Sequence, residues 1–238
     1  MRRDSLARVE RDVVACERCP RLRAWCREVA ENKVRRFARE TYWGRPVPGF
    51  GDPAARLLIV GLAPAAHGAN RTGRLFTGDR SGDFLFAALH RAGFANQAES
   101  RGRGDGLALA GAWISPLVRC APPANKPTPD EILACRGFLA RELALLAGAR
   151  AVLALGGIAW RGFLDVAREL GDWTGPLPRF AHGAEVEVGP RRLLGSYHPS
   201  QQNTFTGRLT PSMLDAVLAR AGSVGGARPV ERRGARRR

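Results

Sequence analysis

The sequence predicts an α/β fold, a three-layer α/β/α sandwich around a short, mostly parallel central sheet. Apolar runs of strand length alternate with helix-like segments along the chain, and this alternation is typical of such a sheet. The run Leu57–Val60 is continuously apolar, as expected for a strand that is buried on both faces. Hydrophobic residues make up 45% of the 238 residues, which is enough for a full core.

The expected elements follow in chain order. Leu6, Val9 and Val13 recur at helical spacing after Asp4-Ser5 and predict a first helix leading to Cys16. Residues 20–56 hold no clear strand. Strands are then expected at 56–60, 112–118, 151–155 and 193–197, with an edge strand at 186–188. Helices are expected at 81–92 with Ser81 as the cap, at 129–147 after a capping box at Thr128, at 157–170 and at 211–221.

The chain is strongly basic, with 38 Lys and Arg against 22 Asp and Glu and a net charge of +16. A polyanionic partner is therefore expected. We predict one domain over residues 1–221. Residues 222–238 carry six arginines against Glu231 and few apolar side chains, so we predict a disordered basic tail there.

The N-terminus has no apolar signal segment, and the longest uncharged apolar runs are about half a membrane span. We expect a cytoplasmic monomer without a membrane partner. In a prokaryote a basic protein of this kind would be found at the nucleoid.

Four cysteines, Cys16, Cys19, Cys120 and Cys135, are spaced as a close pair and two distant residues. Five cysteines in a cytosolic chain of this length do not indicate a disulfide scaffold, so metal ligation is the better interpretation. The spacing alone is compatible with zinc or with an iron–sulfur cluster. Cys26 is the remaining cysteine, and we expect an inert thiol.

Two segments after strands carry candidate chemistry. The loop 61–80 combines four glycines with Arg71, Arg74, Phe76 and Asp79, a composition suited to binding an anion or a base. A plain anion-binding turn, with Asp79 near the helix cap and Phe76 in the core, explains the same residues. The second segment begins at His198, which follows an apolar strand and should point into a crevice at the sheet edge.

Several stretches together resemble the uracil-DNA glycosylase superfamily, most closely its type 5 group. They are Gly61-Leu-Ala-Pro-Ala-Ala-His67, Asn70-Arg-Thr-Gly-Arg-Leu-Phe-Thr-Gly-Asp79, Val118-Arg-Cys-Ala-Pro-Pro-Ala-Asn-Lys-Pro127 and His198-Pro-Ser-Gln-Gln-Asn-Thr-Phe-Thr-Gly-Arg-Leu209. The resemblance implies removal of uracil, and of hypoxanthine and xanthine, from DNA. It also implies that the four cysteines hold a structural [4Fe–4S] cluster rather than zinc.

The resemblance also implies roles for individual residues. Asp79, His198 and Asn125 are the expected catalytic residues, with Asp79 replacing the polar residue that other branches carry in the first motif. Proline stands at position 116, where type 4 relatives have an asparagine that reads uracil, and this predicts a relaxed base choice. The expected base pocket consists of Gly61, Leu62, Ala63, Ala65, His67, Phe76 and Asn125.

DNA contacts are expected from Arg71, Arg74 and the basic region 20–45, and from Gln202, Phe205, Arg208 and Leu209 of the last loop. Phe205 or Leu209 would fill the gap that the everted base leaves. Two other functions fit the composition. They are a DNA-binding protein with a metal site and no activity, and a hydrolase of phosphorylated nucleosides. The lack of a carboxylate cluster for Mg²⁺ argues against the hydrolase.

Overall fold

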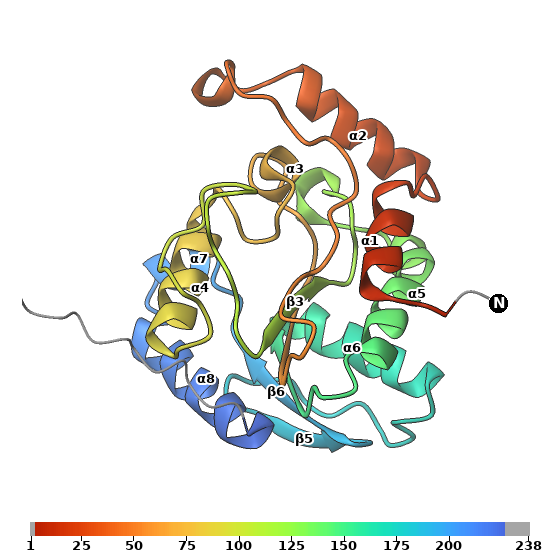
Figure 1. The fold of residues 1–238 in the computed structure, drawn as a ribbon, viewed down its shortest axis with the longest axis vertical. Helices are drawn as coiled ribbons and strands as arrows, with labels where there is room; N and C mark the ends of the chain where they lie inside the picture. The colour runs from red at the N-terminus through yellow and green to blue at the C-terminus, as the bar shows by residue number, and fades with distance from the viewer. Residues whose placement is uncertain (1–2, 227–238) are drawn as a thin grey trace, which may run out of the picture.

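The computed structural model describes residues 3–226, which form a sheet flanked by helices (Figure 1). The strands are β1 (Phe50–Gly51), β2 (Leu57–Gly61), β3 (Ala112–Pro116), β4 (Ala151–Leu155), β5 (Glu185–Val188) and β6 (Arg191–Ser196). Their order is β1-β3-β2-β4-β6-β5. The inner strands β3, β2, β4 and β6 are parallel, and β1 and β5 pair antiparallel at the two edges. The predicted mostly parallel sheet is confirmed.

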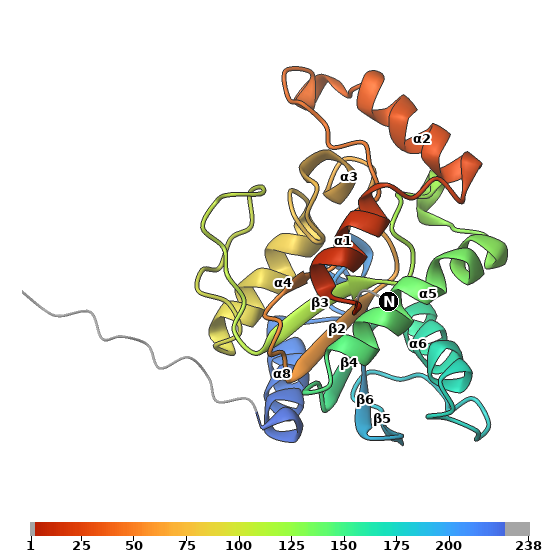
Figure 2. The same ribbon diagram turned by 45° about the vertical axis from the view of Figure 1, so that its right-hand side comes forward.

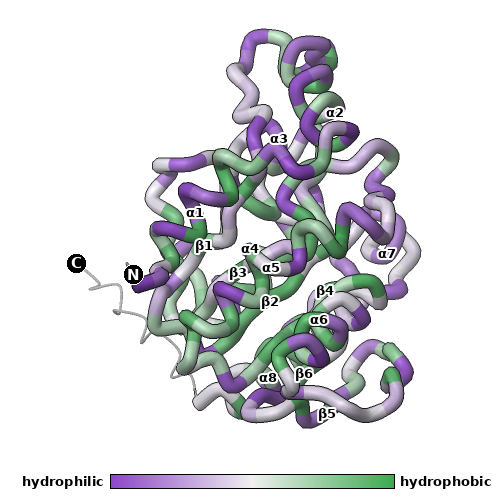
Figure 3. Tube along the Cα trace, turned by 90° about the vertical axis from the view of Figure 1, so that its right-hand side faces the viewer, coloured by the Kyte–Doolittle hydropathy of each residue, from purple (hydrophilic) through white to green (hydrophobic). Residues whose placement is uncertain are grey.

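Helices cover both faces of this sheet, as Figure 2 shows. Because side chains alternate along a strand, Leu58 and Val60 of β2 face one layer and Leu57 and Ile59 face the other. The first layer contains α1 (Leu6–Val14), α2 (Pro20–Glu31), α5 (Pro129–Leu145) and α6 (Gly157–Glu169). The second contains α4 (Arg80–Arg91) and α8 (Pro211–Gly225). Figure 3 shows the hydrophobic strands between these layers.

Local capping signals explain where several helices begin. Ser5 caps α1, and Thr128 forms the predicted capping box with Glu131 at the start of α5. The prediction that Ser81 caps α4 is wrong. Asp79 is the cap, because its Oδ1 accepts the N–H of Gly82 at 3.0 Å.

Other differences from the sequence expectations concern short or polar elements. Region 20–56 contains the two-residue strand β1 and the helix α2, which opens with Pro20. The loop after β2 contains α3 (Ala69–Thr72), and α7 (Gln201–Phe205) follows His198. Helix α8 continues to Gly225, so the predicted tail does not begin at residue 222. The rest of that tail, 227–238, lies outside the described residues.

The parallel strands place three connections at one edge of the sheet. The segments that follow β2, β3 and β6 leave the strands at their carboxyl ends, where ligands bind in sheets of this type. Residues 3–226 contain no helix with the length and apolar character that a bilayer crossing requires.

Candidate active site

A cavity of about 450 Å³ opens at the carboxyl ends of β2, β3 and β6. Its lining residues come from all three connections at this edge. They are Gly61, Leu62, Ala63, Ala65, Leu75, Phe76, Asp79, Arg80, Ser81, Pro116, Asn125, His198, Ser200, Gln201 and Gln202. The structure therefore brings Asp79 and His198, which are more than a hundred residues apart in the sequence, to one cavity.

Asp79 is held at the cavity wall by its role as the cap of α4. One carboxylate oxygen, Oδ1, is engaged by the N–H of Gly82. The other, Oδ2, lies against Gly68, where an added Cβ would come within 2.1 Å of it. Burial raises the pKa of the Asp79 carboxyl, and the backbone N–H groups of Gly82 and Ser81 oppose that rise. The site thus holds a partly desolvated carboxylate with a fixed orientation.

Phe76 adopts a left-handed backbone with φ of 51°, which is strained for an aromatic residue. The absence of a side chain at Gly82 permits it, because a Cβ there would meet the Phe76 carbonyl at 1.8 Å. The Phe76 ring lies 6.0 Å from the His198 ring, with an angle of 34° between their planes. The two rings therefore line the cavity together, and Phe76 offers a flat apolar face to a planar ligand.

His198 lies two residues after the end of β6 and lines the cavity. Its carbonyl accepts a hydrogen bond from Asn203 Nδ2 at 2.9 Å, which ties it to α7. Burial lowers the pKa of His198 to about 4, so the imidazole is neutral at pH 7. A neutral imidazole can donate one hydrogen bond and is not a strong proton donor.

The burial of His198 predicts a pH dependence of stability. Its pKa is about 4 in the folded state, against 6.5 ordinarily, so the unfolded chain binds more protons between these values. The contribution is fully present above pH 6.5 and is lost as the pH falls toward 4. We expect the difference in unfolding free energy between wild type and His198→Asn to decrease over this window in urea titrations. A difference that grows toward acid pH would show a charged imidazole in the fold.

Asn125 reaches the cavity from the connection after β3. Ala124 and Asn125 both have positive φ, at 52° and 56°, in a tight turn that brings the asparagine to the wall. Pro116, the last residue of β3, lines the cavity beside it and offers no side-chain hydrogen bond. Among the lining residues near β3, Asn125 therefore supplies the only side-chain amide.

Of the other residues expected in the base pocket, the structure places all but one at the cavity. Gly61, Leu62, Ala63 and Ala65 line the cavity, but His67 does not. His67 Nδ1 lies 3.0 Å from Tyr42 Oη, so its ring turns toward the segment after α2. The expectation that His67 contacts the base is therefore wrong.

Arg71 was expected at the DNA backbone, but its side chain is buried within the protein. Nε donates to the His67 carbonyl at 2.8 Å, and Nη2 donates to the Gly78 carbonyl at 3.0 Å. Nη1 pairs with the Glu40 carboxylate. With these donors engaged, Arg71 holds the loop in shape and does not present its charge to a phosphate.

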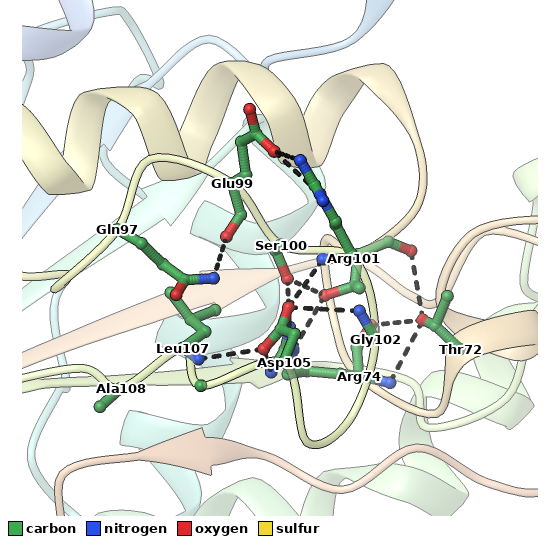
Figure 4. A network of polar contacts seen from close by, with 12 residues as sticks. Thr72, Arg74, Gln97, Glu99, Ser100, Arg101, Gly102, Asp105, Leu107 and Ala108 are labelled. Carbon is green, nitrogen blue, oxygen red and sulfur yellow. Dashed lines mark hydrogen bonds and ion pairs between the residues drawn. The ribbon is translucent and has the colours of Figure 1, made fainter.

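Arg74 is likewise buried, in the network that Figure 4 shows. Its Nη1 and Nη2 donate to the two carboxylate oxygens of Asp105, at 2.9 and 2.5 Å, and Nη2 also donates to Ser100 Oγ at 2.8 Å. Nε donates to Thr77 Oγ1 at 3.2 Å. The prediction that Arg74 binds DNA phosphate is replaced by a structural role, in which it joins the loop after β2 to residues 100–105.

Arg74→Ala should lower the free energy of unfolding by about 3 kcal/mol, because it leaves the largely buried Asp105 without its partner. Arg101→Ala is the control in the same region. It removes an exposed pair with Glu99 and should change stability by less than about 1 kcal/mol. Urea denaturation of both variants measures the difference. Equal stabilities with weaker DNA binding in Arg74→Ala would restore the phosphate role.

The loop after His198 divides into exposed and buried residues. Gln202 lines the cavity, and the exposed Phe205 ring lies 5.5 Å from the Arg80 guanidinium. Arg208 is exposed and lies 4.6 Å from the Tyr197 ring. Leu209 is 1% exposed and belongs to the core beside α4 and α8, so it cannot serve as a wedge. Phe205 remains available for that role.

Sequence reasoning left several cavity residues out of the expected site. Ser81, Ser200 and Gln201 line the cavity. Their positions close to Asp79 or just after His198 are a signal that could have identified them.

The four predicted metal-binding cysteines lie where α1, α2, α5 and the connection after β3 meet. Cys16 and Cys19 are partly buried, and Cys120 and Cys135 are buried. Burial raises the pKa of the Cys135 thiol to about 11, and the nearby Cys16 and Cys19 add to that rise. Cys120 shares a side-chain hydrogen bond with Cys26, which is not among the four predicted ligands. Within residues 3–226, no group of three or more His, Cys, Asp or Glu is placed to hold a metal ion.

Comparison with known proteins identifies the family. The model of the uracil DNA glycosylase superfamily matches residues 48–222, and the chain belongs to this superfamily. Within it, the chain is similar to proteins named type-5 uracil-DNA glycosylase. One from Mycobacterium tuberculosis (strain CDC 1551 / Oshkosh) is 56% identical over 216 residues, which cover 90% of this chain and 80% of the relative. One from Thermus thermophilus is 52% identical over 215 residues, which cover 90% and 95%.

More distant relatives extend the same comparison. A type-5 uracil-DNA glycosylase of Pyrobaculum aerophilum is 46% identical over 214 residues, which cover 90% of this chain and 91% of the relative. A type-4 uracil-DNA glycosylase of Thermotoga maritima is 28% identical over 163 residues, which cover 65% and 69%. The resemblance to the type 5 group is thereby confirmed.

Proposed function

We propose that this protein removes uracil from DNA by hydrolysing the N-glycosidic bond, which initiates base excision repair. The observation that supports this most directly is the single cavity lined by Asp79, His198, Phe76 and Asn125. Its volume of about 450 Å³ suits a small planar ligand. The names of the relatives, type-5 uracil-DNA glycosylase, specify the base.

The base must leave the DNA stack before it can enter the cavity, at a cost of roughly a few kcal/mol. Phe76 would stack on the everted base and Asn125 would contact its polar edge. The exposed Phe205, at the end of α7, would fill the gap in the duplex.

Bond cleavage leaves positive charge on the sugar and negative charge on the base. Neutral His198 would donate a hydrogen bond to the base oxygen where negative charge develops. The carboxylate of Asp79 would orient the attacking water and stabilise the sugar cation. Both groups are held before the reaction, His198 by the hydrogen bond from Asn203 to its carbonyl and Asp79 by its role as the cap of α4, so little reorganisation is needed.

A uracil-containing duplex tests the activity. Incubation followed by alkali breaks the strand only where an abasic site has formed. Breakage supports the glycosylase, whereas binding without breakage would favour a DNA-binding protein without activity. Release of base from free nucleotides alone would favour the nucleoside hydrolase.

We also propose that the base choice extends to hypoxanthine and xanthine. Leu62, Ala63, Ala65 and Pro116 offer no polar side chain that could reject another base. Duplexes with each base in turn, treated as above, measure this range. Cleavage at uracil alone would contradict the extension and leave the main proposal intact.

For the four cysteines we propose a [4Fe–4S] cluster, in line with the family resemblance. A single metal ion needs all its ligands within about 2.3 Å, whereas a cluster takes one thiolate at each iron. Cys16, Cys19, Cys120 and Cys135 are four thiols on the segments where α1, α2, α5 and the connection after β3 meet, which is the number of thiolates that such a cluster takes. The cluster would link α1 and α2 to α5.

Removal of such a cluster should destabilise the protein. Cys135→Ser should lose iron and acid-labile sulfide and unfold at lower urea concentration, because one of the links between the N-terminal helices and α5 would be lost. Iron and sulfide assays on the purified protein provide the measurement. One zinc ion per chain and no sulfide would show that the cysteines bind zinc, and would contradict the proposed cluster.

A further inference from the structure

The segment 33–45, which follows α2, is an exposed run of positive charge that we name the basic arm. Its cations are Lys33, Arg35, Arg36, Arg39 and Arg45. Within the part of the chain that the structure describes, none of these five forms a salt bridge. Figures 1 and 2 show this segment projecting beyond α3, away from the sheet. Unpaired arginines on such a projection are available to a polyanion.

Arg71 fastens the basic arm to the body of the protein. Its guanidinium lies 3.9 Å from the centre of the Phe37 ring and pairs with the Glu40 carboxylate. The backbone adds two hydrogen bonds, from Trp43 N to the Arg71 carbonyl at 2.8 Å and from Gly44 N to the Asn70 carbonyl at 3.0 Å. The arm is therefore attached at α3 by several contacts and is not a free loop.

The same arginine also holds the loop that carries Asp79. Arg71 Nη2 donates to the carbonyl of Gly78, the residue that precedes Asp79, and Nε donates to the carbonyl of His67, which precedes Gly68. Both backbone segments that enclose the Asp79 carboxylate are thus linked through one side chain to the basic arm.

One cation of the arm, Arg36, lies near the end of α4 that borders the cavity. Burial raises the pKa of Asp83, in the first turn of α4, and Arg80 and Arg36 oppose that rise. Arg80 lines the cavity, so Arg36 and Arg80 act on the same end of α4. Phe37 and Glu40 of the arm also contact Arg71, whose Nη2 donates to the carbonyl of Gly78, next to the cavity residue Asp79, so the arm is attached beside the cavity wall.

We propose that the basic arm binds the DNA backbone outside the base pocket, and that Arg71, through Glu40 and Phe37, positions the arm on the catalytic loop. The proposal rests on the proposed function for the identity of the polyanion. It assigns Arg71 as a positioning residue and the arm arginines as the groups that touch phosphate. Binding of the arm would thereby be tied to the geometry around Asp79.

Removal of arm charges provides the first test. Arg35→Ser/Arg36→Ser is compared with Arg56→Ser/Arg150→Ser, which removes equal charge from the opposite edge of the sheet, before β2 and β4. The probe is a duplex with a stable abasic-site analogue, and its Kd is measured against salt. Each lost phosphate contact should reduce the salt slope by about 0.9, so about 1.8 is expected for the first variant and none for the second. Equal slopes in the two variants would overturn the proposal.

Removal of the ion pair between Arg71 and Glu40 provides a second test. In this test, charge alone and the positioning role predict opposite changes in the Kd for DNA. Glu40→Gln makes the arm more positive, so charge alone predicts tighter DNA binding. The positioning role predicts a higher Kd, because the arm loses its ion pair with Arg71. Glu31→Gln removes the same charge from the exposed end of α2, where no salt bridge forms within residues 3–226, and should lower Kd slightly. A lower Kd in both variants would overturn the positioning role.

These outcomes are distinct from failure of the proposed function. The binding tests do not require cleavage, and the alkali assay on wild-type protein decides the activity by itself. If the wild-type protein is active but the Arg35→Ser/Arg36→Ser variant has an unchanged salt slope, the proposal on the basic arm is refuted and the proposed function stands. If the wild-type protein is inactive but the salt slopes change as predicted, the basic arm remains a DNA contact and the proposed glycosylase function is refuted.

Discussion

His198→Ala should lower the single-turnover rate of uracil excision by about 10²- to 10³-fold, while the Kd for DNA changes little. The neutral imidazole is already placed at the end of β6, so its hydrogen bond gains strength only as negative charge develops on the base. The loss is expected in the chemical step for this reason. Rapid-quench measurements with enzyme in excess over uracil duplex separate this step from binding and product release.

The matched control for this variant is His90→Ala. His90 is exposed in the last turn of α4 and does not line the cavity. Its substitution should leave the rate unchanged. A rate in His198→Ala within a few-fold of wild type would remove His198 from the mechanism, and an increase in Kd alone would assign it to binding.

Asp79→Asn should slow excision by about 10²-fold or more while the fold is retained. The asparagine amide oxygen can still accept the hydrogen bond from Gly82 N–H and cap α4, so the substitution removes the negative charge and little else. That charge would stabilise the sugar cation and orient water. Because burial raises the pKa of Asp79, the wild-type rate should also decline toward acid at a higher pH than an ordinary aspartate would give.

Asp83→Asn is the control for charge. It removes an equal charge one turn further along α4, outside the cavity, and should leave the rate near that of wild type. Gly68→Ala tests the placement of Asp79 independently, because the added methyl group would displace Oδ2. We expect it to reduce the rate as well. Wild-type rates in both Asp79→Asn and Gly68→Ala would move the water-positioning role to another residue.

Apolar pattern and turn chemistry predicted most of the fold. The runs at Leu57–Val60 and Ala151–Leu155 are strands within a residue of the expected bounds, and the capping box at Thr128 opens α5 as expected. The helix α2 was not expected, because its residues mix arginines with scattered apolar side chains. The two-residue strand β1 is too short to leave a pattern in the sequence.

Local order in the sequence determined which side chains reach the cavity. Asp79 and His198 each follow a strand of the parallel sheet, and that topology sends the carboxyl ends of the strands to one edge. The strand pattern predicted that both segments leave the same edge of the sheet, and the family resemblance singled out Asp79 and His198 within them.

Only the tertiary structure decided the roles of the arginines and of Leu209. Arg71 and Arg74 lie in a basic loop, and nothing local distinguishes them from phosphate-binding residues. Their acidic partners, Glu40 and Asp105, are each 31 residues away in the sequence. A buried charge requires a partner, and that partner comes into contact only when the chain folds.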